Sequence, residues 1–360
     1  MITKRIIFPV LSVVLGLIAG VCIIAGTIFI HVKWAEAFGH DATPLVRNSR
    51  IAAWLFSNES YYRIIAAARA GPKFRTVADF DQSIALQKRL FVPTEMYGSL
   101  KYRYRPNIGI YNCRIWSGLR FKSRVLRRSN KITTLLKETV HDCIRFRTDE
   151  NGFKPSISPV HDGSNIFFLG DSFTEGLWTS PKNTFVSRVG RKLRSRGLSA
   201  NPINLAVSGY SALEMSWMLE RYAPLFSPKI VIVNLFLNDV HDDFDSVLTG
   251  VNIPDENYKM MFDYLNRIAD YCIVHDIVVL IAVIPTKSQF SEFRQFHVFQ
   301  DRVKMWAEER QLRFLDPREY FDKVGSNDVY LSWDPHFSIE GHKKYADYLA
   351  AHIADVIRSN

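Results

Sequence analysis

Short apolar runs and longer helical patterns alternate regularly through the second half of the chain. The apolar runs predict five strands, at residues 166–169, 203–207, 230–237, 277–284 and 313–315. Between and after them, apolar residues recur every three or four positions, as on a helix with one buried face, most clearly from Tyr258 to Cys272 and from Tyr345 to Val356. Strands that alternate with helices predict a parallel sheet covered by helices on both faces. We expect this α/β domain to occupy residues 146–360.

The start of the chain has a different pattern, because residues 6–30 carry no charge. At ~1.5 Å per residue, a helix of this length exceeds the ~30 Å apolar core of a bilayer. The stretch is also longer than the apolar region of a cleaved signal peptide. We therefore interpret residues 1–31 as a signal-anchor transmembrane helix that is not removed.

The charges beside this span favour a cytoplasmic tail and an exported domain, periplasmic or extracellular. Lys4 and Arg5 lie directly before the span, whereas only Lys33 lies close after it. A very short tail ahead of a large domain favours the same orientation. Arg47 and Arg50 lie near the outer limit of the counting window and weaken this assignment, so the opposite orientation stays open.

Residues 32–145 have no pattern that fixes a fold, and we expect a mixed α+β extension there. Tyrosine, proline and glycine over 93–107 predict short strands and turns. Segment 101–131 holds ten Lys and Arg residues and no acidic residue, which equals the formal net charge of +10. Beside a membrane such a segment attracts anionic lipid or glycan, and a solvated basic surface is an equal interpretation. No nucleic-acid-binding module is recognisable, so we expect no nucleic-acid partner.

The four cysteines do not predict a metal site, since there is no C-x-x-C motif and no cluster of histidines. Cys113 and Cys143 could pair in an oxidising compartment. Cys22 and Cys272 fall within apolar patterns and are expected to be packing residues. We expect neither a metal nor a cofactor.

The first candidate for chemistry follows the first predicted strand. The apolar run 166–169 ends at Gly170, and Asp171 and Ser172 come next. A serine just past the carboxyl end of a parallel strand projects into the crevice where open α/β sheets bind ligands. The alternative is that Ser172 caps a following helix. The motif is not the G-x-S-x-G elbow, because the second glycine, Gly176, comes four residues after the serine.

Three further stretches carry polar residues after the predicted strands, although each alone could be a turn or a cap. Together they supply the parts of acyl transfer. Ser172 is the candidate nucleophile, His336 its general base, and Asp334 the group that orients the imidazole. The N–H groups of Ser172 and Gly209 and the side-chain amide of Asn238 would stabilise the oxyanion.

Three other polar residues have lesser expected roles. We expect Asp171 and Asp239 to support their loops rather than react. His342 is the alternative base, because it lies about one and a half helical turns beyond His336.

These blocks resemble those of the SGNH (GDSL-like) hydrolase superfamily. The sequence Gly170-Asp171-Ser172 resembles the nucleophile block, and Gly209, Asn238-Asp239 and His336 resemble the other three in the same order. Residues 145–153 resemble the lead-in that precedes the nucleophile strand in bacterial members. The resemblance implies a flavodoxin-like three-layer α/β/α sandwich, ester hydrolysis without a metal, and serine, glycine and asparagine as oxyanion donors.

Two positions depart from the family pattern. Phe236 stands two residues before Asn238, where the family usually has glycine. Asp334 precedes His336 by two residues rather than three, a form that resembles some exported relatives that acylate or deacylate sugars. Because of the second departure, the assignment of Asp334 has less support than the assignments of Ser172 and His336.

The resemblance and the apolar N-terminus together predict a membrane-anchored serine esterase. It would hydrolyse or transfer short acyl groups, acetyl above all, on cell-envelope glycans. One alternative is a lipase or lysophospholipase of the same fold. Another is a catalytically idle module of this fold that binds glycan or lipid in an envelope assembly, which the basic segment 101–131 motivates.

Overall fold

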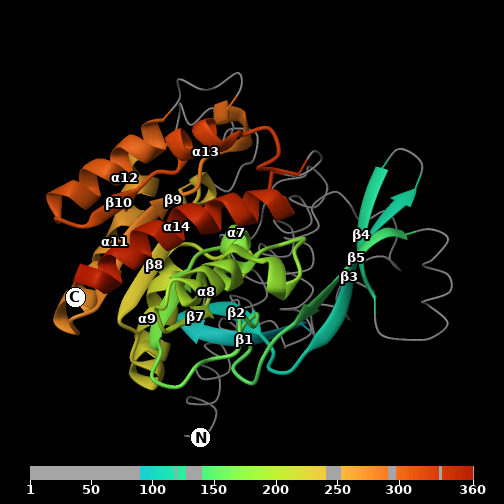
Figure 1. Ribbon diagram of the computed structural model, residues 1–360, viewed down its shortest axis with the longest axis horizontal. Coiled ribbons are helices and arrows are strands. Elements are labelled where there is room, and N and C mark those ends of the chain that lie inside the picture. Colours follow the sequence, from blue (N-terminus) through green and yellow to red (C-terminus); the bar gives the residue numbers. More distant parts are fainter. Residues whose placement is uncertain are drawn as a thin grey trace, which may run out of the picture. The chain divides into compact units, whose positions relative to one another are not determined.

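The computed structural model of the chain describes residues 90–117, 120–126, 140–240, 253–290, 297–331 and 335–359 (Figure 1). The chain divides into two compact units, Met1–Arg105 and Pro106–Asn360, which are described separately below. Among the described residues, no helix has both the length and the apolar character needed to cross a bilayer. The predicted span at 6–30 lies outside the described residues, as does nearly all of 32–90.

In the first unit, strands β1 (Phe91–Met96) and β2 (Ser99–Tyr104) form an antiparallel hairpin. Tyr97 and Gly98 connect them, both with positive φ, as a tight two-residue hairpin turn requires. The ring of Phe91 stacks on that of Tyr104 at a centroid distance of 4.8 Å. The short strands and turn predicted over 93–107 are confirmed.

The second unit begins with a three-stranded antiparallel sheet in the order β4-β3-β5. Its strands are β3 (Gly109–Ser117), β4 (Arg120–Leu126) and β5 (Val140–Arg147). No strand was predicted over residues 108–145, yet β3 and β4 show that much of the basic segment 101–131 belongs to a sheet. Cys113 and Cys143 are register partners on the adjacent strands β3 and β5.

The remainder of this unit is built on a parallel sheet of five strands in the order β10-β9-β8-β6-β7. The strands are β6 (Ser164–Leu169), β7 (Ala200–Asn204), β8 (Ile230–Leu235), β9 (Val278–Val283) and β10 (Arg313–Leu315). Numbered along the chain, this is the flavodoxin-like order 2-1-3-4-5, whose switch point lies beside the first strand. The predicted parallel α/β sheet is confirmed.

The second strand was predicted at the wrong place, three residues too late. β7 ends at Asn204, and the buried residues Leu205, Ala206 and Val207 that follow it resemble a strand in sequence without belonging to the sheet. Pro202 lies inside β7, which is possible because β7 is an edge strand.

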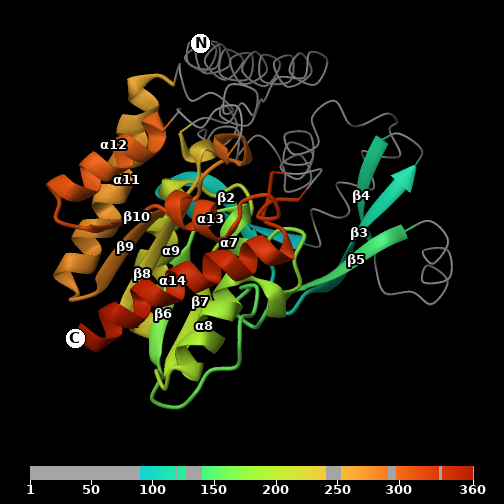
Figure 2. The same cartoon turned by 45° about the horizontal axis from the view of Figure 1, so that its top comes forward.

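Helices cover both faces of the sheet, in three layers (Figures 1 and 2). One face packs against α8 (Phe185–Ser195), α13 (Arg318–Val324) and α14 (Ile339–Ser359). The other faces α9 (Ala212–Phe226), α11 (Asp255–Val274) and α12 (Val298–Glu309). Neighbouring residues of β6 alternate between the faces, since Phe168 contacts Phe185 of α8 and Phe167 contacts Phe226 of α9. Short helices α7 (Ser172–Glu175), η2 (Pro181–Asn183), η3 (Leu237–Asp239) and η4 (Lys287–Phe290) follow strands or loops.

Candidate active site

The turn after β6 is built for close packing. Gly170 has a φ of +156°, and a Cβ atom there would lie 2.2 Å from Oγ1 of Thr174, so no other residue fits. Asp171 is the N-cap of α7, because its Oδ1 accepts a hydrogen bond of 2.9 Å from the Phe173 N–H. Ser172 is the first residue of that helix. The interpretation that Ser172 serves as the helix cap is therefore wrong.

Ser172 and His336 lie within hydrogen-bonding distance, although 164 positions separate them in the sequence. The imidazole Nε2 is 2.7 Å from the serine Oγ. This is the distance that a general base needs to take the hydroxyl proton of a nucleophile. Asp334, the predicted partner of His336, lies outside the described residues.

The loop that carries His336 is held by backbone pairing. Tyr330 and Phe337 form an isolated antiparallel bridge, and the Leu331 N–H donates to the His336 carbonyl at 2.9 Å. The Tyr330 hydroxyl donates to the Pro285 carbonyl at 2.6 Å, which ties this loop to the end of β9.

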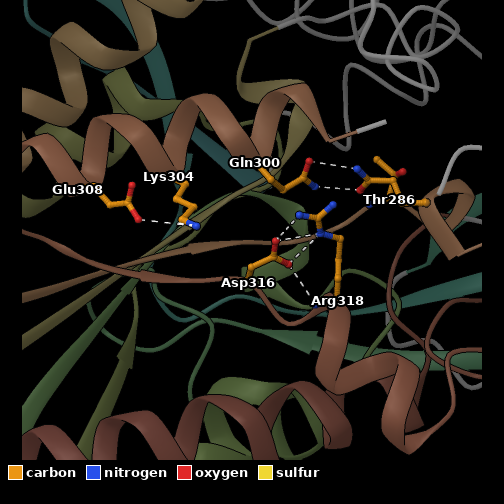
Figure 3. Close-up of polar contacts among 7 residues, drawn as sticks. Thr286, Gln300, Lys304, Glu308, Asp316 and Arg318 are labelled. Atoms are coloured by element: carbon orange, nitrogen blue, oxygen red, sulfur yellow. Dashed lines mark hydrogen bonds and ion pairs between the residues drawn. The ribbon is translucent and has the colours of Figure 1, made fainter. Parts of the chain in front are cut away.

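The loop after β9 is itself fixed by a pair of buried amides (Figure 3). Gln289 and Gln300 exchange two hydrogen bonds, of 3.1 and 2.9 Å, and Oε1 of Gln289 also accepts from the Thr286 N–H. Figure 3 also shows the ion pair between the carboxylate of Asp316 and the guanidinium of Arg318 just after β10. The loop to which the Tyr330 hydroxyl is bonded is therefore itself held by polar side-chain contacts.

An aromatic ring lies against the imidazole, and a second ring packs behind the first. The ring of Phe173 lies 4.7 Å from that of His336, at an interplanar angle of 33°. Phe236 packs behind Phe173 with a centroid distance of 4.3 Å and is only 2% exposed. The bulky residue at the usual glycine position is therefore buried beneath Phe173.

Asn238 is oriented by the residue next to the nucleophile. Its Nδ2 donates to Oδ2 of Asp171 at 3.0 Å, which fixes the direction of the amide. Burial raises the pKa of the Asp171 carboxyl, and the Phe173 N–H, the Asn238 amide and the charge of His336 oppose that rise. Asp239 accepts a hydrogen bond of 2.8 Å from the Phe236 N–H, as a loop-supporting residue would.

The loop after β7 is attached to the nucleophile turn. Gly209 is exposed and has a φ of 81°. The preceding Ser208 N–H donates to Oε2 of Glu175 at 2.7 Å, and Nδ2 of Asn204 donates to the Thr174 carbonyl at 2.9 Å. The stretches around Gly209, Asn238 and His336 are thus each connected by a hydrogen bond to residues 171–175.

The comparison with known families agrees with this arrangement. Residues 168–344, which carry all of these contacts, match the model of the GDSL-like lipase/acylhydrolase family. This part of the chain belongs to that family. The resemblance inferred from the four sequence blocks is confirmed, and the protein is a serine hydrolase of the GDSL type. No curated protein sequence matches the chain.

Solved structures with the same kind of fold are distant. An acetylxylan esterase from Geobacillus stearothermophilus is 19% identical over 54% of this chain and 96% of its own, with a TM-score of 0.44. The esterase EstA from a Pseudoalteromonas species is 15% identical over 54% of this chain and 99% of its own, with a TM-score of 0.43. Structures this distant do not bear on the chemistry of the present chain.

Within the GDSL-like domain, His342 is engaged elsewhere. Its Nδ1 accepts a hydrogen bond of 3.2 Å from the Phe185 N–H at the start of α8. Burial, and then the charges of Lys154 and Arg188, hold the pKa of His342 well below its ordinary value. A buried neutral histidine with its Nδ1 occupied is a packing residue, so the contact with Ser172 favours His336 as the base.

Two charged residues of the GDSL-like domain were not recognised from the sequence. Lys154 and Glu175 are both buried beside the nucleophile turn. Signals were present, since Lys154 follows the lead-in 145–153 directly and Glu175 lies three residues after Ser172. Charged residues seldom become fully buried, and the sequence alone does not show that these two do.

Proposed function

We propose that this protein is a membrane-anchored, exported serine esterase that hydrolyses or transfers short acyl groups, acetyl above all, on cell-envelope glycans. The observation that carries the esterase part is the 2.7 Å contact between His336 Nε2 and Ser172 Oγ. A binding module that had lost its activity would have no need of this contact. The contact is therefore the reason to prefer an enzyme over the idle module.

The chemistry follows from the positions of the side chains. Ser172 Oγ attacks the ester carbonyl carbon while His336 takes its proton, and the carbonyl oxygen becomes an oxyanion. The N–H groups of Ser172 and Gly209 and the second Nδ2 hydrogen of Asn238 are the proposed donors to that oxyanion. The first N–H of a helix has no acceptor within the helix, so the Ser172 N–H suits this role.

Collapse of the tetrahedral intermediate breaks the bond to the alcohol, which receives the proton from His336. Ser172 is left as an acyl-enzyme, and water or a sugar hydroxyl then attacks it with His336 again acting as base. Hydrolysis and transfer share all of these residues and differ only in the acceptor. Asp334 is the proposed partner that orients His336 in both.

The remaining parts of the proposal rest on the sequence. The apolar stretch 6–30 supports the anchor, and the charges around it support export. The short Asp334-to-His336 spacing resembles exported relatives that act on acylated sugars, which supports acetyl groups on glycans as the substrate. The basic segment 101–131 supports contact with anionic lipid or glycan.

The test is turnover of p-nitrophenyl acetate, butyrate and octanoate by the full chain in detergent, beside Ser172→Ala. We expect short-chain esters to be hydrolysed best and the variant to lose turnover while keeping its fold. Equal turnover by the variant would refute the serine mechanism. A preference for octanoate would favour the lipase, and no turnover by the folded wild type would favour a transferase with its own donor or the idle module.

Export can be tested through the cysteines. Residues directly opposite each other in an antiparallel pair have Cα atoms ~4.5–5.5 Å apart, which is within disulfide range. Cys113 and Cys143 are such partners, so an exported domain should contain this disulfide. Thiol alkylation without reductant, followed by intact-mass measurement, should show two fewer labels than after reduction. Full labelling of protein purified from the envelope would contradict the pairing.

A further inference from the structure

A lysine is buried directly behind the nucleophile turn. Lys154 is only 3% exposed, and its Nζ donates to the carbonyl oxygens of Gly176 and Thr179 at 2.7 and 2.8 Å. Gly176 is the C-cap of α7, the single turn that begins with Ser172. The ammonium also lies 5.6 Å from the centroid of the Phe146 ring. The ammonium group of Lys154 therefore stabilises the backbone at the end of the nucleophile turn through two hydrogen bonds.

A glutamate on the same turn binds the loop after β7, which carries Ser208 and Gly209. Glu175 is 1% exposed, and its Oε2 accepts hydrogen bonds from both the N–H, at 2.7 Å, and the hydroxyl of Ser208. The carbonyl of Ser208 and the N–H of Gly209 belong to one planar peptide unit. Fixing Ser208 therefore restrains the direction of the Gly209 N–H, the proposed oxyanion donor.

The two buried charges depend on each other, because an isolated buried charge is strongly unfavourable. Burial lowers the pKa of Lys154 to about 8, and the negative charge of Glu175 opposes that shift. Among the residues that the structure describes, two further titratable or charged groups are linked to this pair: His342 of α14, whose pKa is lowered by burial and then by the charges of both Lys154 and Arg188, and Arg188 of α8. His342 is neutral, and the guanidinium of Arg188 donates to the carbonyl and the side-chain oxygen of Asn183.

We propose that Lys154 and Glu175 are positioning residues, a charge-paired unit that holds the nucleophile turn and the Gly209 N–H in their working geometry and requires the lysine to be charged. The inference rests on the proposed esterase function. It assigns a role in catalysis to two residues that touch neither the substrate nor the reacting atoms.

The pH dependence separates a positioning role from a purely structural one. Above pH ~8 folded Lys154 loses its proton, whereas an unfolded lysine keeps it up to ~10.4. In that window the unfolded state binds more protons, so this group makes the free energy of unfolding rise with pH. Activity should fall over the same window, because the counter-charge of Glu175 disappears. Over this pH window the free energy of unfolding should therefore rise while the activity falls.

The experiment measures kcat, KM and urea stability from pH 6 to 10 for the full chain, with the Ser172→Ala rate subtracted. The variants are Lys154→Met, Lys154→Arg and Glu175→Gln, and Lys343→Met is the control because it removes an exposed lysine that pairs with Glu340 within α14. Misplacing a reacting group by ~1 Å can cost ~100-fold in rate.

We expect Lys154→Met and Glu175→Gln to lower kcat about 10- to 100-fold with little change in KM. Lys154→Arg should retain most of the activity and keep it above pH 8, and the control should behave as wild type.

Two results would overturn the inference while leaving the esterase intact. One is a Lys154→Met variant with wild-type kcat, and the other is a Lys154→Arg variant whose alkaline loss matches that of wild type. If Lys154→Met does not fold, the comparison between wild type and Lys154→Arg decides alone. Absence of any Ser172-dependent turnover in wild type would overturn the proposed function and this inference together.

Discussion

The nucleophile turn is held by buried hydrogen-bonding groups, whereas the imidazole of the histidine loop lies against an aromatic ring that is backed by a second one. On the first side, Asp171 and Glu175 bind the loops that carry Asn238 and Gly209. On the second side, the imidazole of His336 lies against Phe173, which packs in turn on Phe236. The two sides meet at the hydrogen bond between Ser172 and His336.

The difference corresponds to what each side must do. Oxyanion donors must point at one position, and hydrogen bonds to buried carboxylates fix direction, because their strength depends on angle. The imidazole must accept a proton and become a cation, and the face of an aromatic ring attracts a cation without fixing a single orientation. We therefore expect substitutions on the polar side to cost more activity than substitutions on the aromatic side.

The largest effect is expected where the two sides meet. Because nucleophile and base act as one unit, His336→Ala should lower kcat by about as much as Ser172→Ala, and the double variant should be no worse. Losses of roughly 10³- to 10⁶-fold are typical of such units. Steady-state kinetics on p-nitrophenyl acetate measure all three variants. A greater loss in His342→Ala than in His336→Ala would show that the base is misassigned.

The polar side comes next. Asn238→Ala should lower kcat about 100- to 1,000-fold, since it removes one oxyanion donor, while KM changes little. Asn257→Ala is the matched control, because Nδ2 of Asn257 donates to the Val240 carbonyl at 2.7 Å and so supports the same loop without a proposed catalytic role. An equal loss in both variants would mean that Asn238 acts only by holding the loop.

Much of this arrangement could be predicted from the sequence, because strand periodicity and the four blocks are local patterns. The strand at 166–169, the one at 313–315 and the helix from Tyr258 to Cys272 are found where the pattern predicts them. The second strand was misplaced because burial continues beyond the sheet edge.

What the sequence does not show is contact between residues far apart in the chain. The Lys154 contact with Thr179 crosses 25 positions, and Phe173 and Phe236 are separated by the two crossovers that lead from β6 to β8. No fixed spacing along the sequence predicts either contact, because the tertiary fold and not the period of a helix or strand brings the partners together. The same holds for the buried His342, whose sequence position close to His336 suggested a base while its contacts make it a packing residue.

The aromatic side should give a smaller effect. Phe173→Leu removes the ring that faces the imidazole, and a lost contact worth about 0.5–1 kcal/mol corresponds to roughly a 2- to 5-fold lower kcat. Phe236→Leu leaves that ring in place and is the control for packing alone. Both variants need a check of folding by thermal unfolding. If Phe236→Leu lowered kcat as much as Phe173→Leu, packing rather than the ring face would be what holds the imidazole.

The smallest effect on activity is expected at His342, where the consequence is for stability. Burial is the main reason that the pKa of His342 in the folded protein lies well below the ordinary value. As the pH falls below ~6.5, the unfolded chain therefore binds a proton at this residue that the folded chain does not bind. This group therefore removes up to ~1.4 kcal/mol of unfolding free energy per pH unit below that point. Urea unfolding between pH 5 and 7 should show a shallower slope in His342→Gln than in wild type. His161→Gln, which changes a histidine with an almost fully exposed side chain, should keep the wild-type slope. An unchanged slope in His342→Gln would mean that His342 takes up a proton as readily in the folded chain as in the unfolded one, which its acceptance of the Phe185 N–H opposes.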